Sequence, residues 1–69
     1  MREQVIIKFG QKLKALRKSK GLSQSDLADI SDFNRNYIGM VERGERNPTL
    51  KTISRLAEAL KIDISDFFV

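Results

Sequence analysis

Apolar residues recur along this 69-residue chain at spacings of three and four, the period of an α-helix with one buried face. The first such segment predicts an amphipathic helix over residues 5–18 with a basic outer face, and Gly21 is expected to end it. The apolar face of this helix consists of Ile6, Phe9, Leu13 and Leu16. No segment alternates apolar and polar residues as a half-buried strand does, so the pattern predicts helices only.

Residues 23–44 predict two short helices, at 24–30 and 35–43, joined by a tight turn. Ser23 is a favoured N-cap, and Asp26 stands three residues later, where its carboxylate can complete a capping box. Asn34 is expected to cap the second helix and Gly44 to close it. The small Ala28 allows the helices to cross closely. The face that would hold the pair against the rest of the domain consists of Leu27, Phe33, Ile38 and Val41.

The last third of the chain predicts two more helices after a loop that contains Pro48. Thr49 is expected to cap the first, and Asp63 to cap a short terminal helix that runs to the last residues. The stripe of the longer helix consists of Leu50, Ile53, Leu56, Ala57 and Leu60. The whole pattern predicts a single all-α domain over residues 1–69, with five helices and a compact core.

Composition excludes several classes of protein. An apolar content of 41% suffices for a small helical domain, which at this length buries only about 60% of the surface of its unfolded chain. With no His and no Cys, the usual base–nucleophile pairs and metal-ligand sets are missing, which argues against an enzyme and predicts neither cofactor nor metal. No signal peptide or apolar run of ~20 residues is present, so a cytoplasmic protein without membrane association is expected.

The net charge of +4 is unevenly distributed. Residues 1–22 carry seven basic side chains against Glu3 alone, and residues 23–32 carry three aspartates and no base. Residues 33–51 are again net positive. Basic segments on both sides of the 23–44 region favour a polyanionic partner, although a solvated surface of mixed charge is an equally valid interpretation of charge alone.

The ordered motifs S-Q-x-x-L-A, N-R-x-Y-I and V-E-R-G, followed by E-R-N-P-T-L and R-L-A-E-A-L-K-I, cover nearly the whole chain. This set resembles the lambda-repressor/Cro-like (XRE) helix-turn-helix regulators. Within that family, N-R-N-Y-I-G and E-R-G-E-R-N-P are most similar to the small controller proteins of restriction–modification systems. One position departs from the family pattern, because Asp32 stands in the turn where glycine is frequent. Aspartate can adopt the left-handed conformation at modest cost.

The resemblance implies that the helix at 35–43 reads DNA, with its first turn and one face toward the bases. The residues expected to read bases are Asn34, Arg35, Asn36 and Met40. Arg35 offers a fork for guanine O6 and N7, Asn36 can pair with adenine N6 and N7, and Met40 suits a thymine methyl. The alternative is that Arg35 and Asn36 are solvated residues at a helix start.

Contacts to the DNA backbone are expected from Gln24, Tyr37, Arg43, Arg46 and Asn47, and more weakly from Lys8, Lys12 and Lys20. In similar family members the glutamine at the Gln24 position clasps the backbone, and free amides at that helix start also favour phosphate. Packing against the preceding helix is an equal role for Tyr37. Gly39 permits close approach of DNA or of that helix, or is incidental. The family pattern also implies a structural ion pair between Arg17 and Glu42.

The last eight residues contain five large apolar side chains, which exceeds what a terminal turn normally buries: Ile62, Ile64, Phe67, Phe68 and Val69. Some of these side chains must complete the core. The others would form an exposed apolar patch, which predicts a homodimer interface. A dimer would place two reading helices about 34 Å apart, as a pseudo-palindromic operator requires. The expected function is sequence-specific regulation of transcription on double-stranded DNA, with no small-molecule effector evident. The alternatives are an antitoxin-type protein-binding module and the isolated DNA-binding domain of a longer repressor.

Overall fold

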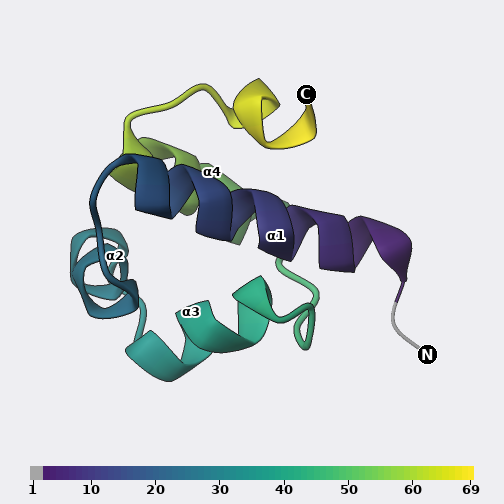
Figure 1. Cartoon of the computed structure of the whole chain (residues 1–69), viewed down its shortest axis with the longest axis horizontal. Helices are drawn as coiled ribbons and strands as arrows, with labels where there is room; N and C mark the ends of the chain where they lie inside the picture. The colour runs from purple at the N-terminus through teal and green to yellow at the C-terminus, as the bar shows by residue number, and fades with distance from the viewer. Residues whose placement is uncertain (1–2) are drawn as a thin grey trace.

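The computed structural model describes residues 3–69 and is helical throughout (Figure 1). The elements are α1 (Gln4–Ser19), α2 (Gln24–Ser31), α3 (Arg35–Glu42), α4 (Leu50–Leu60) and the short 3-10 helix η1 (Ile64–Phe68). The all-α prediction is confirmed, but the fifth element is not an α-helix. It spans five residues and begins with a bond from the Asp66 N–H to the Asp63 carbonyl, the tighter pattern that short terminal segments adopt.

The boundaries of α1, α2 and α3 differ from the predicted ones by at most one residue, and Arg43 is the C-cap of α3 instead of its last residue. Met1 and Arg2, the second of which belongs to the basic segment at the start of the chain, lie outside the described residues. Within residues 3–69, no helix is long and apolar enough to cross a membrane.

The four predicted N-caps all hold a backbone amide through their side chains. The acceptors are Ser23, Asn34, Thr49 and Asp63. At the other ends, Gly21 and Gly44 adopt left-handed backbone with φ of 72° and 73°, which ends α1 and α3 without the strain of a Cβ atom. Local chemistry therefore sets where the helices begin and end.

The core lies between the four α-helices and η1. In Figure 1, α1 passes in front of α4, with α3 below and η1 above, and α2 closes one end of the assembly. The contacts agree, because α1 packs on α3 and η1, while α2 packs on both α3 and α4. The largest fully buried side chains come from all four α-helices: Leu13, Leu27, Ile38, Val41, Leu56 and Leu60. The reading-helix candidate α3 is thus held from two sides.

The crossing of α1 and α3 depends on Gly10. A Cβ atom added there would lie 2.7 Å from the carbonyl oxygen of Glu42 and would also collide with the carbonyl oxygen of Val41. Both obstacles are backbone atoms at the end of α3, which cannot rotate away as a side chain can. The absence of a side chain at Gly10 therefore sets how closely α3 sits under α1.

Candidate nucleic-acid interface

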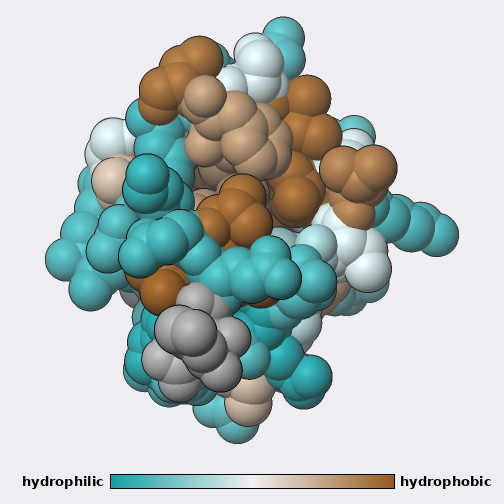
Figure 2. Space-filling model, turned by 90° about the vertical axis from the view of Figure 1, so that its right-hand side faces the viewer, coloured by the Kyte–Doolittle hydropathy of each residue, from teal (hydrophilic) through white to brown (hydrophobic). Residues whose placement is uncertain are grey.

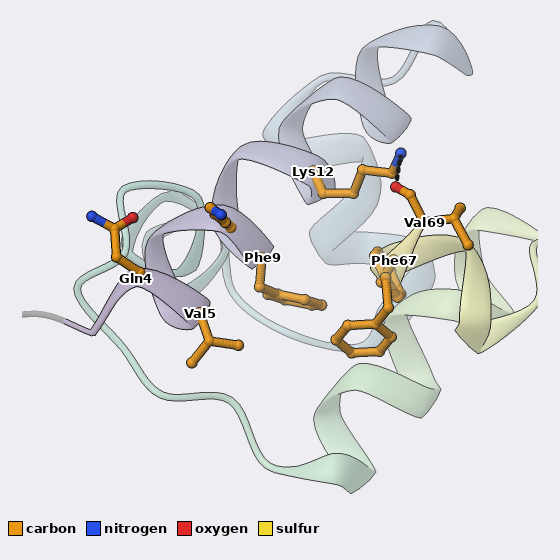
Figure 3. A pocket seen from close by; sticks show the side chains of 8 residues that line it. Gln4, Val5, Phe9, Lys12, Phe67 and Val69 are labelled. Atoms are coloured by element: carbon orange, nitrogen blue, oxygen red, sulfur yellow. Dashed lines mark hydrogen bonds between the residues drawn. The ribbon is translucent and has the colours of Figure 1, made fainter.

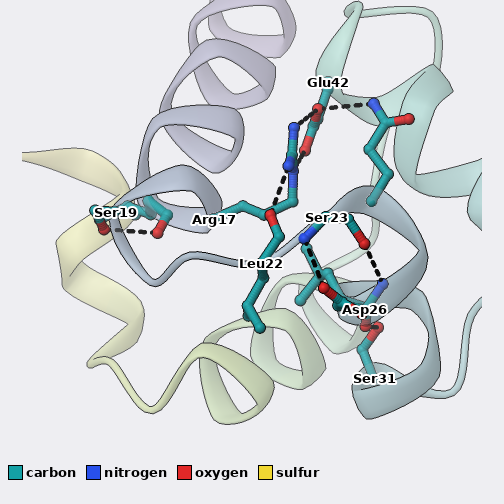
Figure 4. Close-up of polar contacts among 10 residues, drawn as sticks. Arg17, Ser19, Leu22, Ser23, Asp26, Ser31 and Glu42 are labelled. Atoms are coloured by element: carbon teal, nitrogen blue, oxygen red, sulfur yellow. Dashed lines mark hydrogen bonds and ion pairs between the residues drawn. The ribbon is translucent and has the colours of Figure 1, made fainter.

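The start of α2 is fixed by a complete capping box. The Ser23 hydroxyl oxygen accepts from the Asp26 N–H at 3.0 Å, and the Ser23 N–H donates to an Asp26 carboxylate oxygen at 2.9 Å (Figure 4). Hydrogen bonding to the carboxylate, first by the Ser23 backbone N–H and then by the Ser23 hydroxyl group, lowers the pKa of Asp26 because it stabilises the charged form. The geometry predicted from the spacing of these two residues is confirmed.

The turn between α2 and α3 contains one non-glycine residue in the left-handed region. Asp32 has φ 62° and ψ 38°, as the sequence predicted for the position where the family frequently carries glycine. The Phe33 N–H donates to the Ala28 carbonyl at 2.9 Å, which closes the end of α2 in a Schellman arrangement. The chain can therefore turn within three residues, the last of which, Asn34, caps α3.

Asn34 places the first turn of α3. Its side-chain oxygen accepts from the Tyr37 N–H at 2.7 Å, so this half of the carboxamide is used as a cap. The amide NH₂ half keeps its two donors for an outside acceptor. Asn34, Arg35 and Asn36 are all exposed at this end of the helix. Polar side chains thus surround a helix start that is itself held rigid.

A shallow hollow of about 250 Å³ lies along the outer face of α3. Its lining brings together four predicted DNA contacts from α3 and its cap and one from the following loop: Asn34, Asn36, Tyr37, Met40 and Arg46. Asn36 and Met40 are four residues apart and share this face of the helix. Arg35 is exposed at the first position of α3, beside the hollow and outside its lining. Base-reading and backbone-contacting candidates therefore meet on one surface.

Tyr37 packs as well as faces outward. It is half-buried, and its ring lies 5.1 Å from the ring of Phe33 between centroids. This packing is on the turn between α2 and α3, not on the preceding helix as the sequence suggested, and the place of Tyr37 in the hollow leaves its outward face available to a partner.

A buried network joins three helices behind this surface (Figure 4). The Arg17 Nε atom lies 2.6 Å from one Glu42 oxygen, and Arg17 Nη2 donates to the other at 3.1 Å. Arg17 Nη1 donates to the Leu22 carbonyl at 2.7 Å, and the side chains of the pair are only 8% and 2% exposed. The network links α1, the loop before α2 and the last residue of α3, so it fixes the far end of α3 as Asn34 fixes the near end.

Gln24 belongs to this network. Its Nε2 atom donates to Glu42 at 3.0 Å, so the amide donors expected to reach a phosphate are turned inward in the structure. The backbone N–H of Gln24 at the first position of α2 stays among the free amides of that helix start. Gln24 therefore orients α3 through its side chain and can meet a phosphate through its backbone.

The basic residues after α3 differ in their surroundings. Arg43 is bonded to Glu45 at 3.0 and 3.2 Å, and this bond together with the negative charge of Glu45 raises the pKa of Arg43. Its guanidinium also lies over Gly39, where an added Cβ atom would be 3.0 Å from Nη1. Arg46 and Asn47 are exposed in the following loop. Arg46 is therefore the better placed of the two arginines for a phosphate.

The weaker lysine candidates lie elsewhere. Lys12 donates to the main-chain oxygen of Val69 at 3.2 Å (Figure 3). Lys8 lines a second hollow, between the start of α1 and η1. Lys20 is exposed at the C-cap of α1. The structure does not bring Lys8 and Lys12 together with the α3 surface.

The C-terminal apolar cluster divides as the sequence anticipated. Phe67 is 4% exposed and packs against Phe9 with ring centroids 4.9 Å apart, so it belongs to the core. It is therefore not among the residues that could contact a second copy of the chain. Ile62 is half-buried against the core. Exposed members remain at Ile64, Phe68 and Val69, of which Phe68 is 60% and Val69 87% exposed.

Two positions that support the site were not identified from the sequence. Gly10 lies in a helix whose pattern gives no sign of a close crossing. Arg55 on α4 donates to the turn between α2 and α3. The sequence indicates a role for Arg55 only indirectly. The last carbonyl groups of α2 have no donor within the helix, so another part of the chain must supply one. Among residues 3–69, no group of three His, Cys, Asp or Glu is arranged to hold a metal ion.

Residues 13–67 match the model of the HTH_3 helix-turn-helix family. The chain belongs to this family. The match confirms the resemblance to XRE-type regulators that the motifs indicated.

Named relatives of this HTH_3 protein include control proteins and a phage repressor. Control protein C.SmaI of Serratia marcescens is 46% identical over 56 residues, which cover 81% of this chain and 67% of the relative. Control protein C.BamHI of Bacillus amyloliquefaciens is 39% identical over 97% of this chain and 88% of its own length. The immunity repressor protein of Bacillus phage phi105 is 41% identical over 81% of this chain, and there the chain spans only 39% of the relative.

Solved structures show the same relationship. The restriction-modification controller protein C.AhdI from Aeromonas hydrophila superposes with a TM-score of 0.89 at 51% identity, over 91% of this chain and 96% of that chain. The wild-type controller protein C.Esp1396I superposes with a TM-score of 0.89 at 33% identity, over 96% and 85%. Both matches include nearly the whole domain, so the similarity extends well beyond the helix-turn-helix.

Proposed function

We propose that this protein is a sequence-specific, double-stranded DNA-binding regulator of transcription of the restriction–modification controller type. In this proposal it acts as a homodimer on a pseudo-palindromic operator. The observation that carries it is the α3 surface. There a rigidly capped helix start presents exposed Asn34, Arg35 and Asn36, and two of these, Asn34 and Asn36, line a hollow together with Arg46. The relatives named as control proteins, which this chain matches over most of its length, support the narrower assignment.

Base reading falls to the exposed polar side chains of the first turn. Arg35 supplies a planar fork for guanine, and Asn36 pairs with adenine through its carboxamide. Met40, half-buried in the hollow, offers its methyl group to thymine. Asn34 contributes through the amide NH₂ that its capping bond leaves available. Each good bidentate pair discriminates by about 1–3 kcal/mol, so two per subunit suffice for a selective dimer.

Backbone contacts surround this surface. Arg46 and Asn47 follow α3 in an exposed loop, and the free amides at the start of α2 attract phosphate through the helix dipole. The Tyr37 hydroxyl adds a donor at the edge of the hollow. Arg43 contributes less because its guanidinium already donates to the Glu45 carboxylate. These contacts hold the protein in register without reading sequence.

The proposed dimer interface is an apolar patch made of Val5, Phe68 and Val69, with Phe9 and Phe67 beneath it. The three surface members are 60%, 60% and 87% exposed and line a hollow of about 530 Å³ between the start of α1 and η1 (Figure 3). Figure 2 shows apolar side chains gathered on this end of the molecule. A second copy would remove this patch from water, as a two-fold operator requires of a dimer.

The test is in-vitro selection from a random duplex library with the wild-type protein, Arg35→Ala and Lys18→Ala. Lys18 is an exposed base on α1, so its variant matches the charge change away from α3. A two-fold motif that loses preference at one symmetric base pair only in Arg35→Ala supports the proposal. The absence of enrichment at moderate salt overturns it and favours a protein partner for this fold.

Two solution measurements test the assembly. A dimer that neutralises about eight phosphates gives a slope of log K against log salt near −7, whereas a shallow slope contradicts extensive backbone contact. Light scattering of the selected complex is expected to show two chains of 7.9 kDa per duplex. One chain per duplex would refute the homodimer.

A further inference from the structure

Arg55, on the outer side of α4, reaches across to the turn that joins α2 and α3. Its Nη2 atom donates to the carbonyl oxygens of Ser31 at 2.7 Å and Asp32 at 2.8 Å. The Asp32 carboxylate is 3.9 Å away and fully exposed, so water screens that attraction. The contact is therefore a hydrogen-bonded clasp on the backbone of the turn, made by one charged donor group.

This clasp falls on the weakest point of the helix-turn-helix. Asp32 is held in left-handed backbone without being glycine, and the carbonyls of Ser31 and Asp32 lie at the end of α2, where no intrahelical donor remains. A cation at a helix C-terminus also matches the negative end of the dipole. Arg55 thus satisfies the groups that the turn leaves unpaired and holds the residue that bends the chain.

The same guanidinium extends the contact to α3. Its carbon lies 4.0 Å from the centre of the Phe33 ring, and that ring packs on Tyr37 with centroids 5.1 Å apart. Phe33 precedes the N-cap Asn34, and Tyr37 supplies the amide that Asn34 holds. The stack Arg55–Phe33–Tyr37 therefore runs from α4 to the first turn of the proposed reading helix.

We propose that Arg55 is a positioning residue that fixes the angle at which the first turn of α3 leaves the α2–α3 turn. This inference rests on the proposed DNA-reading function. Arg55 acts through the turn carbonyls and Phe33, with its donor group directed at the protein's own backbone. Its loss should therefore weaken selective binding more than general attraction to DNA.

The DNA experiment compares Arg55→Ala, Arg55→Lys and the control Lys18→Ala on the duplex selected by wild-type protein and on a scrambled duplex. Lysine keeps the charge but has neither the planar fork nor the stacking face. Both Arg55 variants are expected to lose about tenfold in affinity for the selected duplex, with an unchanged salt slope in Arg55→Lys and little change on the scrambled duplex. Two results would instead show a phosphate contact and overturn the proposal. One is wild-type affinity in Arg55→Lys. The other is a salt slope reduced by about one in Arg55→Ala, with equal losses of affinity on both duplexes.

A second experiment is independent of DNA. Amide hydrogen exchange of the Phe33 and Tyr37 N–H groups is expected to quicken about tenfold in Arg55→Ala and Arg55→Lys, while the core amide of Leu13 keeps its protection. An equal loss at Leu13 means general destabilisation, and no change at Phe33 means no clasp; either result overturns the proposal. If wild-type protein selects no duplex, the proposed function fails, and the exchange experiment still decides whether Arg55 holds the turn.

Discussion

Gly10→Ala tests how tightly α3 is seated under α1. The added methyl would lie 2.7 Å from the Glu42 carbonyl oxygen and closer than van der Waals contact to that of Val41, so the two helices must separate by about half an ångström or more. Overpacking of this kind costs about 1–3 kcal/mol, and the separation also loosens the ion pair that Glu42 makes with Arg17. Alanine returns about 1 kcal/mol of helix propensity. Because the obstacles are backbone atoms, we expect the cost to be about 3 kcal/mol and the net loss to be about 2 kcal/mol.

A loss of that size is large for this domain. At ordinary values per residue, a domain of this length has a free energy of unfolding of about 3–10 kcal/mol. Two kcal/mol therefore correspond to a decrease of about 8–16 °C in Tm. Urea and thermal unfolding followed by circular dichroism would measure both quantities.

Gly39→Ala is the matched control, because Gly39 is also a buried helical glycine. There the nearest atoms are the Arg43 guanidinium at 3.0 Å and the Gln24 amide oxygen at 3.7 Å, both at the ends of flexible side chains. The free energy of unfolding of Gly39→Ala should stay the same or rise by up to about 1 kcal/mol. A Tm of Gly10→Ala at or above wild type would refute the close crossing, as would equal losses in the two variants.

Three further outcomes follow from the contacts. Arg17→Met leaves Glu42 buried without its charged partner, although Gln24 still donates to it, and should lower the free energy of unfolding by about 3–5 kcal/mol in urea titrations; a loss below about 1 kcal/mol would show that Gln24 or other donors suffice for Glu42. The folded-state pKa of Asp26 is lowered, so its contribution is present above the ordinary value of 3.8 and lost as the pH falls through the folded value. Asp26→Asn should reduce the acid sensitivity of Tm below about pH 4, and an unchanged pH profile would contradict this. Phe68→Ala removes about 100 Å² of exposed apolar surface from each protomer, and burial of that area in a dimer would contribute about 2 kcal/mol. The variant should therefore weaken self-association at least tenfold in sedimentation equilibrium. Unchanged association would place the interface elsewhere.

The sequence predicted those parts of the fold that depend on neighbouring residues. Ser23, Asn34, Thr49 and Asp63 cap helices where their spacing indicated, because a cap needs only amides two or three residues away. The 3-10 character of the terminal element was missed, since a five-residue segment has too few turns for its period to distinguish the two helix types.

Contacts between elements were harder to predict. The sequence shows that Gln24 stands at a helix start, but only the structure shows its amide directed at Glu42 instead of outward. Arg55 looks from the sequence like one more solvated base on an amphipathic helix. Its role depends on a carbonyl 23 residues away that becomes a neighbour only after α4 has packed on α2.

The brevity of α3 has a thermodynamic consequence. Eight residues are fewer than an isolated helix needs to persist in water, so the helicity of α3 exists only while α1, α2 and the buried Arg17–Glu42 pair hold it. Folding of the domain and assembly of its outer α3 surface are therefore one equilibrium. A ligand that binds that surface therefore binds only the folded state. It must raise the melting temperature in proportion to the logarithm of its concentration. A thermal shift titration then reports binding to the folded domain without any label on the ligand.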